Sequence, residues 1–210
     1  MTPAVSHRVF EPGTTGWTVD DLYDPEIQSL WSGGRFELVD GVLTKMAPQG
    51  FEGVEPLDNL RRSVERHLDA TSQGGNFYRE VDLLLRRGRI ARPDMLLLTP
   101  EQLRRQKKLQ KARKLKPGKY HPIYVAPYLV VESVSLLHED HDRVTKLEWY
   151  AAAGIPHYWL LTGFERSLIC HVLDGARYVQ QSAGTDDEIV RSGAFGGVSI
   201  PLAKVWDVFA

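Results

Sequence analysis

The pattern of hydrophobic and polar positions after residue 17 predicts a short helix followed by a hairpin. A capping-box signal at Thr18 favours a helix over roughly 18–30. In the segment RFELVDGVLTKM, Asp40-Gly41 separates two alternating runs, as in hairpins with a two-residue turn. The residues expected on the core side are Phe36, Leu38 and Val42.

The next periodic segment predicts one amphipathic helix and a second hairpin. Leu57, Leu60, Val64 and Leu68 are three or four positions apart, so they share one helical face. The helix is expected to stop near Ser72. The run FYREVDLLL, an Arg-Gly pair and the run RIARPDMLLL then predict two antiparallel strands.

Strand and helix patterns alternate through the rest of the chain. PYLVVESVS is typical of one buried strand, and a helix is expected over roughly 139–153, ending before Gly154 and Pro156. HYWLLTG, SLICHVL, ARYVQQS and a C-terminal strand extension follow. The order predicts an α/β (α+β) fold with a mixed central sheet flanked by helices. We expect a flexible arm over 1–17 and a single domain over 18–210.

Composition narrows the class of protein. The 210 residues include 26 basic and 27 acidic side chains, and 42% are hydrophobic, as in an ordinary globular protein. The single cysteine, Cys170, excludes an internal disulfide framework and a cysteine-rich zinc site. No apolar run reaches the roughly 20 residues of a membrane helix, and the N-terminus lacks a signal-peptide pattern. We expect a soluble, cytoplasmic protein with no membrane partner.

One segment departs from this even charge balance. Residues 101–119, EQLRRQKKLQKARKLKPGK, contain nine Lys or Arg and one acid. Such a cluster can neutralise backbone phosphates without sequence preference; the alternative is an exposed helix that only aids solubility. No aromatic residue precedes Tyr120, so base stacking is not expected from this basic insertion. The candidate nucleic-acid contacts within it are Arg104, Arg105, Lys107, Lys108 and Lys111.

Two acids lie in or beside strands that the pattern predicts to be buried. Glu132 is inside LVVESV, and Asp94 follows Pro93 directly before MLLL. An isolated buried carboxylate is costly, so each must be paired, protonated or bound to a metal. The alternative for Glu132 is a place at the strand end, paired with an arginine.

The predicted helix after Glu132 carries a polar stripe. His138, Asp142, Lys146 and Tyr150 recur every four residues, which places them along one side of the helix. Because the helix follows the Glu132 strand, this side can face the end of that strand. The alternative is a solvated face with an Asp142–Lys146 ion pair worth roughly 0.3 kcal/mol.

Several short motifs occur in a recognisable order. They are ELVDG at 37–41, RPD at 92–94, VVESVS at 130–135, an aspartate and a lysine at 142 and 146, Tyr150, and GIPHYWLL at 154–161. In order and spacing the chain resembles, over about residues 18–205, the Uma-type putative restriction endonuclease family of the PD-(D/E)xK nuclease superfamily. The resemblance implies a restriction-endonuclease-like core, in which a mixed sheet carries acids that converge on a divalent metal.

The resemblance also implies roles for individual residues. Asp94 and Glu132 match the two superfamily acids. The superfamily lysine position holds Val134, and Lys146 matches the migrated lysine of this branch. Glu37 matches a further acid at the first hairpin, which implies an extra metal ligand or a helper in catalysis. The implied ligands of Mg²⁺ (or Mn²⁺) are Asp94, Glu132 and the backbone carbonyl of Ser133.

Other polar residues near these acids complete the expected site. Arg79, Arg89 or Arg92 could bind the scissile phosphate, and salt bridges to Glu80 or Asp82 are the equal alternative. The supporting residues are Asp142 and Tyr150. The resemblance implies an endonuclease that hydrolyses DNA, as a homodimer because two active sites suit two strands. The alternative is a weak or inactive nucleic-acid-binding or regulatory protein on the same fold.

Overall fold

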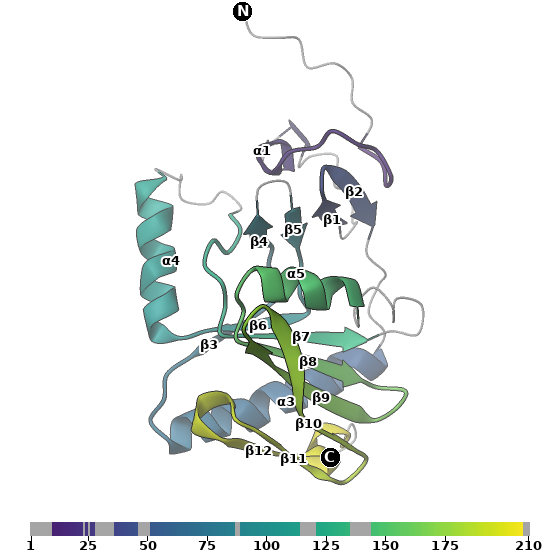
Figure 1. Cartoon of the computed structure of the whole chain (residues 1–210), viewed down its shortest axis with the longest axis vertical. Helices are drawn as coiled ribbons and strands as arrows, with labels where there is room; N and C mark the ends of the chain where they lie inside the picture. The colour runs from purple at the N-terminus through teal and green to yellow at the C-terminus, as the bar shows by residue number, and fades with distance from the viewer. Residues whose placement is uncertain are drawn as a thin grey trace, which may run out of the picture.

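The large sheet of the protein has six strands in the order β10-β9-β8-β7-β6-β3 (Figure 1). The computed structural model describes residues 10–22, 24, 26–27, 36–45, 51–86, 89–113, 121–134 and 144–207. The six strands are β3 (Asn76–Arg79), β6 (Met95–Leu98), β7 (Leu129–Val134), β8 (His157–Thr162), β9 (Ser167–Asp174) and β10 (Arg177–Thr185). Strands β7 and β8 are parallel and the other neighbours antiparallel, so the predicted α/β (α+β) class with a mixed sheet is confirmed.

Two smaller sheets and five helices accompany this sheet within the described residues. The four-stranded sheet has the order β2-β1-β5-β4 and consists of β1 (Phe36–Val39), β2 (Val42–Lys45), β4 (Leu83–Arg86) and β5 (Arg89–Ala91). The C-terminal pair is β11 (Ile189–Ser192) and β12 (Val198–Pro201), the predicted strand extension. The helices are α1 (Val19–Leu22), α3 (Phe51–Ala70), α4 (Pro100–Ala112), α5 (Lys146–Ala152) and α6 (Leu202–Val205).

The β1–β2 hairpin turns where the sequence predicts. Asp40 and Gly41 have φ of 50° and 84°, the left-handed values that a two-residue hairpin turn requires at both positions. This turn pairs Leu38 with Leu43, and both side chains are fully buried. Directly paired residues point to the same side of a sheet. Leu43 is therefore the core residue of β2, and the expectation for Val42, which is only partly buried, is wrong.

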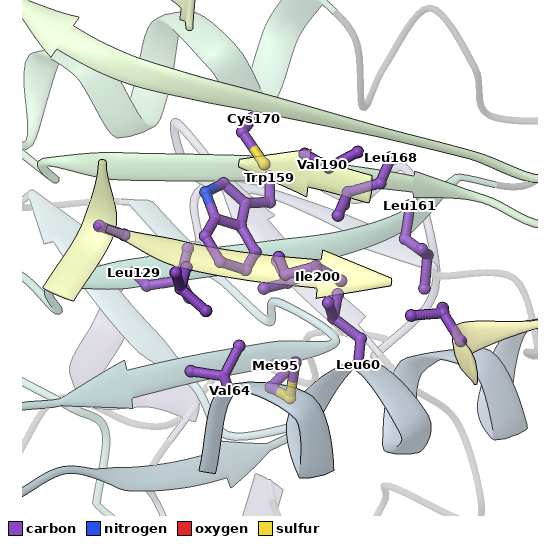
Figure 2. Close-up of a cluster of buried hydrophobic side chains, with 14 of the residues drawn as sticks. Leu60, Val64, Met95, Leu129, Trp159, Leu161, Leu168, Cys170, Val190 and Ile200 are labelled. Atoms are coloured by element: carbon purple, nitrogen blue, oxygen red, sulfur yellow. The ribbon is translucent and has the colours of Figure 1, made fainter. Parts of the chain in front are cut away.

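Helix α3 covers one side of the large sheet with the predicted face. Its buried residues Leu60 and Val64 pack against Met95 and Trp159 of the sheet (Figure 2). Strands β11 and β12 contribute further side chains to the same cluster. Burying one such aliphatic side chain stabilises the fold by roughly 1.5–3 kcal/mol. This apolar layer packs against β6 and β7 on the side that faces α3.

Helix α5 covers the opposite side of the same strands. Leu96 of β6 and Val130 of β7 point away from α3 and pack with Trp149 and Tyr150 of α5. Alternation along β6 and β7 explains the two layers, because successive residues of a strand face opposite sides. Glu132 shares the α5 side with Val130, so its carboxylate enters the space beneath this helix.

The segment predicted as a second hairpin is divided between the two larger sheets. Strand β3 pairs with β6 in the large sheet, whereas β4 pairs with β5 in the small one. The chain therefore crosses between the sheets at Glu80–Asp82 and crosses back at Arg92–Asp94. Pro93 explains the second crossing, since it lacks an N–H group to continue the ladder and restricts the residue before it.

Helix α4 fills the connection between β6 and β7. Thr99 caps its first turn and exchanges hydrogen bonds with Gln102, and Pro100 opens the helix. The buried side chain of Gln106 hydrogen-bonds the backbone of Pro122 and Tyr124. Residues 114–119 of the predicted basic insertion lie outside the described residues.

The other expectations are met only in part of their ranges. Helix α1 covers the beginning of the helix expected over 18–30, and the helix expected over 139–153 is described as α5, with residues 135–143 outside the described part. From residue 10 on, the predicted arm lies on the β1–β2 hairpin, and Trp17 is buried there. That 18–210 form a single domain stays a prediction. None of the described helices is both long and apolar enough to cross a membrane.

Candidate active site

Five buried polar side chains converge where the two larger sheets meet. Glu37 comes from β1, Asp94 directly precedes β6, Glu132 lies on β7, and Lys146 and Tyr150 lie on α5. Each is at most 6% exposed. The structure thus brings together residues that the chain separates widely. We call these five side chains the acid cluster.

The register of β6 and β7 places the two central acids side by side. Met95 pairs with Val131 in antiparallel register, so Asp94 lies opposite Glu132, one position further. The backbone N–H of Asp94 donates to Glu132 Oε2 over 3.4 Å, and that of Ser133 donates to Asp94 Oδ2 over 2.7 Å. Each carboxylate is therefore oriented by the backbone of the strand that carries the other.

Lys146 bridges acids of the two sheets. Its Nζ atom lies 3.2 Å from Glu132 Oε1 and 3.5 Å from Glu37 Oε1. The cluster combines three carboxyl groups with one ammonium group, and buried charges require compensation. A divalent cation bound beside these carboxyl groups would supply such compensation.

Tyr150 lies one helical turn after Lys146 and acts on the same oxygen of Glu132. Its hydroxyl group donates to Glu132 Oε1 over 2.6 Å. Burial, and next the charge of Glu132, raises the pKa of Tyr150 well above its usual value. The hydroxyl group therefore keeps its proton and remains a donor. The side of α5 that carries Lys146 and Tyr150 is buried, in contrast to the solvated face considered from the sequence.

Arg92 connects the acid cluster to the second sheet crossing. Its backbone N–H donates to Glu37 Oε1 over 3.1 Å, and its Nε donates to Asp82 Oδ1 over 2.7 Å. Both side chains of this ion pair are at least nine-tenths buried. Of the two alternatives for Arg92, the structure shows the salt bridge to Asp82. The pair joins the two crossings and holds the segment that presents Asp94.

The two other arginines of the predicted phosphate site are also paired with acids. Arg79 NH1 lies 3.9 Å from Asp58 Oδ1. Arg89 binds Asp40, and its guanidinium carbon lies 4.5 Å from the centroid of the Trp149 ring. These contacts connect α3 with β3 and the small sheet with α5.

The remaining predicted site residues lie elsewhere. The five candidate contact residues of the basic insertion are exposed on α4, outside the acid cluster. His138 and Asp142 are outside the described residues. Ser133 reaches the cluster through its backbone N–H. The sequence analysis named Asp82 only as an alternative partner for the arginines; its burial directly before the apolar residues LLL is a signal similar to that of Glu132.

The acids present fit a hard divalent cation better than zinc. In the described part of the chain, no group of three or more His, Cys, Asp or Glu side chains is placed to hold one ion. Structural and catalytic zinc sites need three or four such ligands. Mg²⁺ takes one or two carboxylates and completes its shell with water and substrate phosphate. Asp94 and Glu132, oriented side by side, provide such a pair.

Comparisons with known proteins identify a family and a similar fold. The family model described as "Uma2: Putative restriction endonuclease" matches residues 24–203. No curated protein matches the chain. Among solved structures, a "putative nuclease belonging to DUF820" from Anabaena variabilis is similar, with a TM-score of 0.60 and 11% identity over 82% of this chain and 90% of that one. At this identity the likeness concerns the fold.

Proposed function

Because the chain belongs to the Uma2 family of putative restriction endonucleases, we propose that it is a metal-dependent endonuclease that hydrolyses phosphodiester bonds in DNA. The observation that carries the proposal is the buried convergence of Asp94, Glu132 and Lys146. The three residues come from separate places in the chain: directly before β6, on β7 and on α5. A phosphate bound beside them would meet two carboxylates and one ammonium group.

Asp94 and Glu132 would hold the cation, with the backbone carbonyl of Ser133 as a third oxygen ligand. When bound, Mg²⁺ or Mn²⁺ supplies charge neutralisation for the phosphate and activation of the attacking water. Tyr150 and Lys146 both contact Oε1 of Glu132, so they fix the orientation of this ligand. Orientation of ligands by hydrogen-bonded neighbours is a general requirement of metal sites.

Lys146 would act on the attacking water and on the charge that develops at the phosphate. An ammonium group here orients the water and stabilises the additional negative charge of the transition state. Glu37 holds the ammonium group from the other side, at 3.5 Å. We assign Glu37 a positioning role, because its contact with the reaction passes through Lys146.

The experiment that tests this function is plasmid cleavage with Mg²⁺ and then Mn²⁺. Wild type is compared with Asp94→Asn and with Asp69→Asn, an exposed acid at the end of α3 that serves as control. We expect nicking or linearisation by wild type and the control, and none by Asp94→Asn or in EDTA.

A second measurement separates the enzyme from the non-cutting alternative. A cation that binds only the folded state raises the melting temperature, and Asp94→Asn should abolish this shift. A metal-dependent shift without cleavage of plasmid, single-stranded DNA or RNA would favour the inactive binding or regulatory protein. The homodimer stays a prediction. Sedimentation of the purified protein measures its oligomeric state.

A further inference from the structure

Helix α4 carries its cations and its packing residues on different sides. Leu103, Gln106 and Leu109 face the protein, where both leucines pack against the layer under α5. Arg104, Lys107, Lys108 and Lys111 are all exposed and stand at i, i+3, i+4 and i+7. This spacing places their side chains in one stripe along the helix. Arg105 is exposed beside it.

The stripe has no neutralising partner among the residues that the structure describes. Glu101 is the one acid of α4, and none of the four stripe cations forms a hydrogen bond or ion pair with another described residue. Like charges at i, i+4, as in the pairs Arg104–Lys108 and Lys107–Lys111, destabilise a helix. A helix that served only solubility would gain from acids interspersed at these positions. The uninterrupted stripe therefore favours an anionic partner.

Hydrogen bonds at the start and the middle of α4 hold the helix that carries the stripe in place. The capping box at Thr99 fixes the first turn, and the side chain of Gln106 hydrogen-bonds Pro122 O and the N–H of Tyr124. From Arg104 to Lys111 the stripe extends about 10 Å, at 1.5 Å per residue. Duplex DNA carries one negative charge per roughly 1.7 Å of its axis, so several phosphates lie within this length.

We propose that this stripe on α4 is a docking surface for the phosphate backbone of double-stranded nucleic acid, separate from the acid cluster. The proposal adds to the nuclease function and rests on it, because that function is the reason to choose nucleic acid as the anionic partner. Helix α4 begins beyond the end of β6 that is remote from Asp94, and in Figure 1 it stands at the side of the molecule away from the β1–β2 hairpin. The stripe thus holds nucleic acid at a distance from the acids.

The same observations decide against an anionic membrane as the partner. A helix that lies in a membrane interface inserts an apolar side beneath its cations. In α4 the apolar residues Leu103 and Leu109 are used for packing within the protein. The described helix also contains no aromatic residue, so its contacts are expected with phosphates and not with stacked bases.

The test is equilibrium binding of the full chain to a short fluorescein-labelled DNA duplex in EDTA, between about 50 and 200 mM KCl. The variant is Lys107→Gln with Lys108→Gln and Lys111→Gln. The matched control removes three exposed cations elsewhere, Arg177→Gln, Arg191→Gln and Lys204→Gln, and so has the same net charge. Circular dichroism and the melting temperature verify that both variants are folded.

We expect the α4 variant to bind more weakly than wild type and the control. Each lost phosphate contact lowers the slope of log affinity against log salt by about 1, so the slope should fall by up to about 3. The control should retain the wild-type slope. Equal slopes in all three proteins, or no duplex binding by wild type, would overturn the proposal.

A second set of results separates this proposal from related ones. Wild-type binding to phosphatidylserine vesicles that the α4 variant loses, without duplex binding, would assign the stripe to membranes and overturn it. Binding is measured in EDTA and cleavage with Mg²⁺ or Mn²⁺, so the two results are independent. Binding that depends on α4, without cleavage in the presence of metal, supports the stripe and contradicts the nuclease. Cleavage with binding that does not depend on α4 supports the nuclease and contradicts the stripe.

Discussion

Lys146 of α5 and Glu132 of β7 form a buried ion pair, with Nζ 3.2 Å from Oε1. The same ammonium group lies 3.5 Å from Glu37 on the other sheet. One lysine therefore connects a helix with strands of both larger sheets. Val134, two residues after Glu132 on β7, is part of the apolar layer under α5. The positive charge beside Glu132 comes from the helix and not from the strand.

Replacing Lys146 should affect both cleavage and stability. Lys146→Met removes the cation but keeps a similar volume, and it leaves buried carboxylates uncompensated. We expect cleavage to fall by roughly 10²–10⁴-fold and the free energy of unfolding by about 3–5 kcal/mol. Mg²⁺ should raise the melting temperature more in the variant than in wild type, because it replaces the missing charge. Lys204→Met, at an exposed position, is the control; unchanged cleavage by Lys146→Met would remove the lysine from the reaction.

Tyr150 can be compared with a matched tyrosine in the same apolar layer. Tyr178 donates to the backbone oxygen of Ile155 over 2.7 Å, whereas Tyr150 donates to Glu132. Tyr150→Phe should cost about 1.5–3 kcal/mol and Tyr178→Phe about 1 kcal/mol, since bonds to charged groups are stronger. Only Tyr150→Phe should raise the metal concentration that gives half-maximal cleavage. An equal effect of both variants on the metal response would contradict the positioning role of Tyr150.

The Asp82–Arg92 ion pair should contribute far more than a surface pair. Asp82→Asn leaves the buried guanidinium group without its partner, so we expect a loss of about 3–5 kcal/mol. Asp186→Asn, which breaks the exposed Arg166–Asp186 pair, should cost less than about 1 kcal/mol. Urea unfolding measures both. A double-mutant cycle with Arg92→Met isolates the interaction, and coupling near zero would show that the pair does not join the two crossings.

His157 should make the protein less stable in acid. Burial lowers the pKa of His157 below its usual value. In the unfolded chain the imidazole takes up a proton near its ordinary pKa of about 6.5. The unfolded state then binds more protons, so stability falls as the pH drops below that value and through the lower folded pKa. The melting temperature should therefore decrease less in His157→Gln than in wild type between about pH 7.5 and pH 5.

Tyr128→Phe is the control for this pH dependence. It removes the hydroxyl group that lies 3.2 Å from His157 Nε2 but keeps the titrating ring. We expect it to lower the melting temperature while retaining the wild-type loss on acidification. If His157→Gln and wild type lose stability in parallel, other groups account for the acid sensitivity.

Local patterns in the sequence were sufficient for several elements. The Asp40-Gly41 turn, the buried face of α3 and the strand character of LVVESV follow from interactions between residues close together in the chain. An Asp-Gly pair accepts left-handed dihedral angles, and a spacing of three or four places side chains on one helical face. The presence of acids beside apolar strands likewise indicated Asp94 and Glu132 as candidates.

The tertiary structure alone decided which of these residues meet. The segment around RPD reads as part of one hairpin, but its strands belong to two sheets, and this division brings Glu37 and Arg92 together. The register of β6 with β7 then sets Asp94 beside Glu132. Such contacts join residues far apart in the chain, so they depend on how whole sheets and helices pack. Periodicity specifies the side of an element that is buried, whereas packing specifies the partner that it meets there.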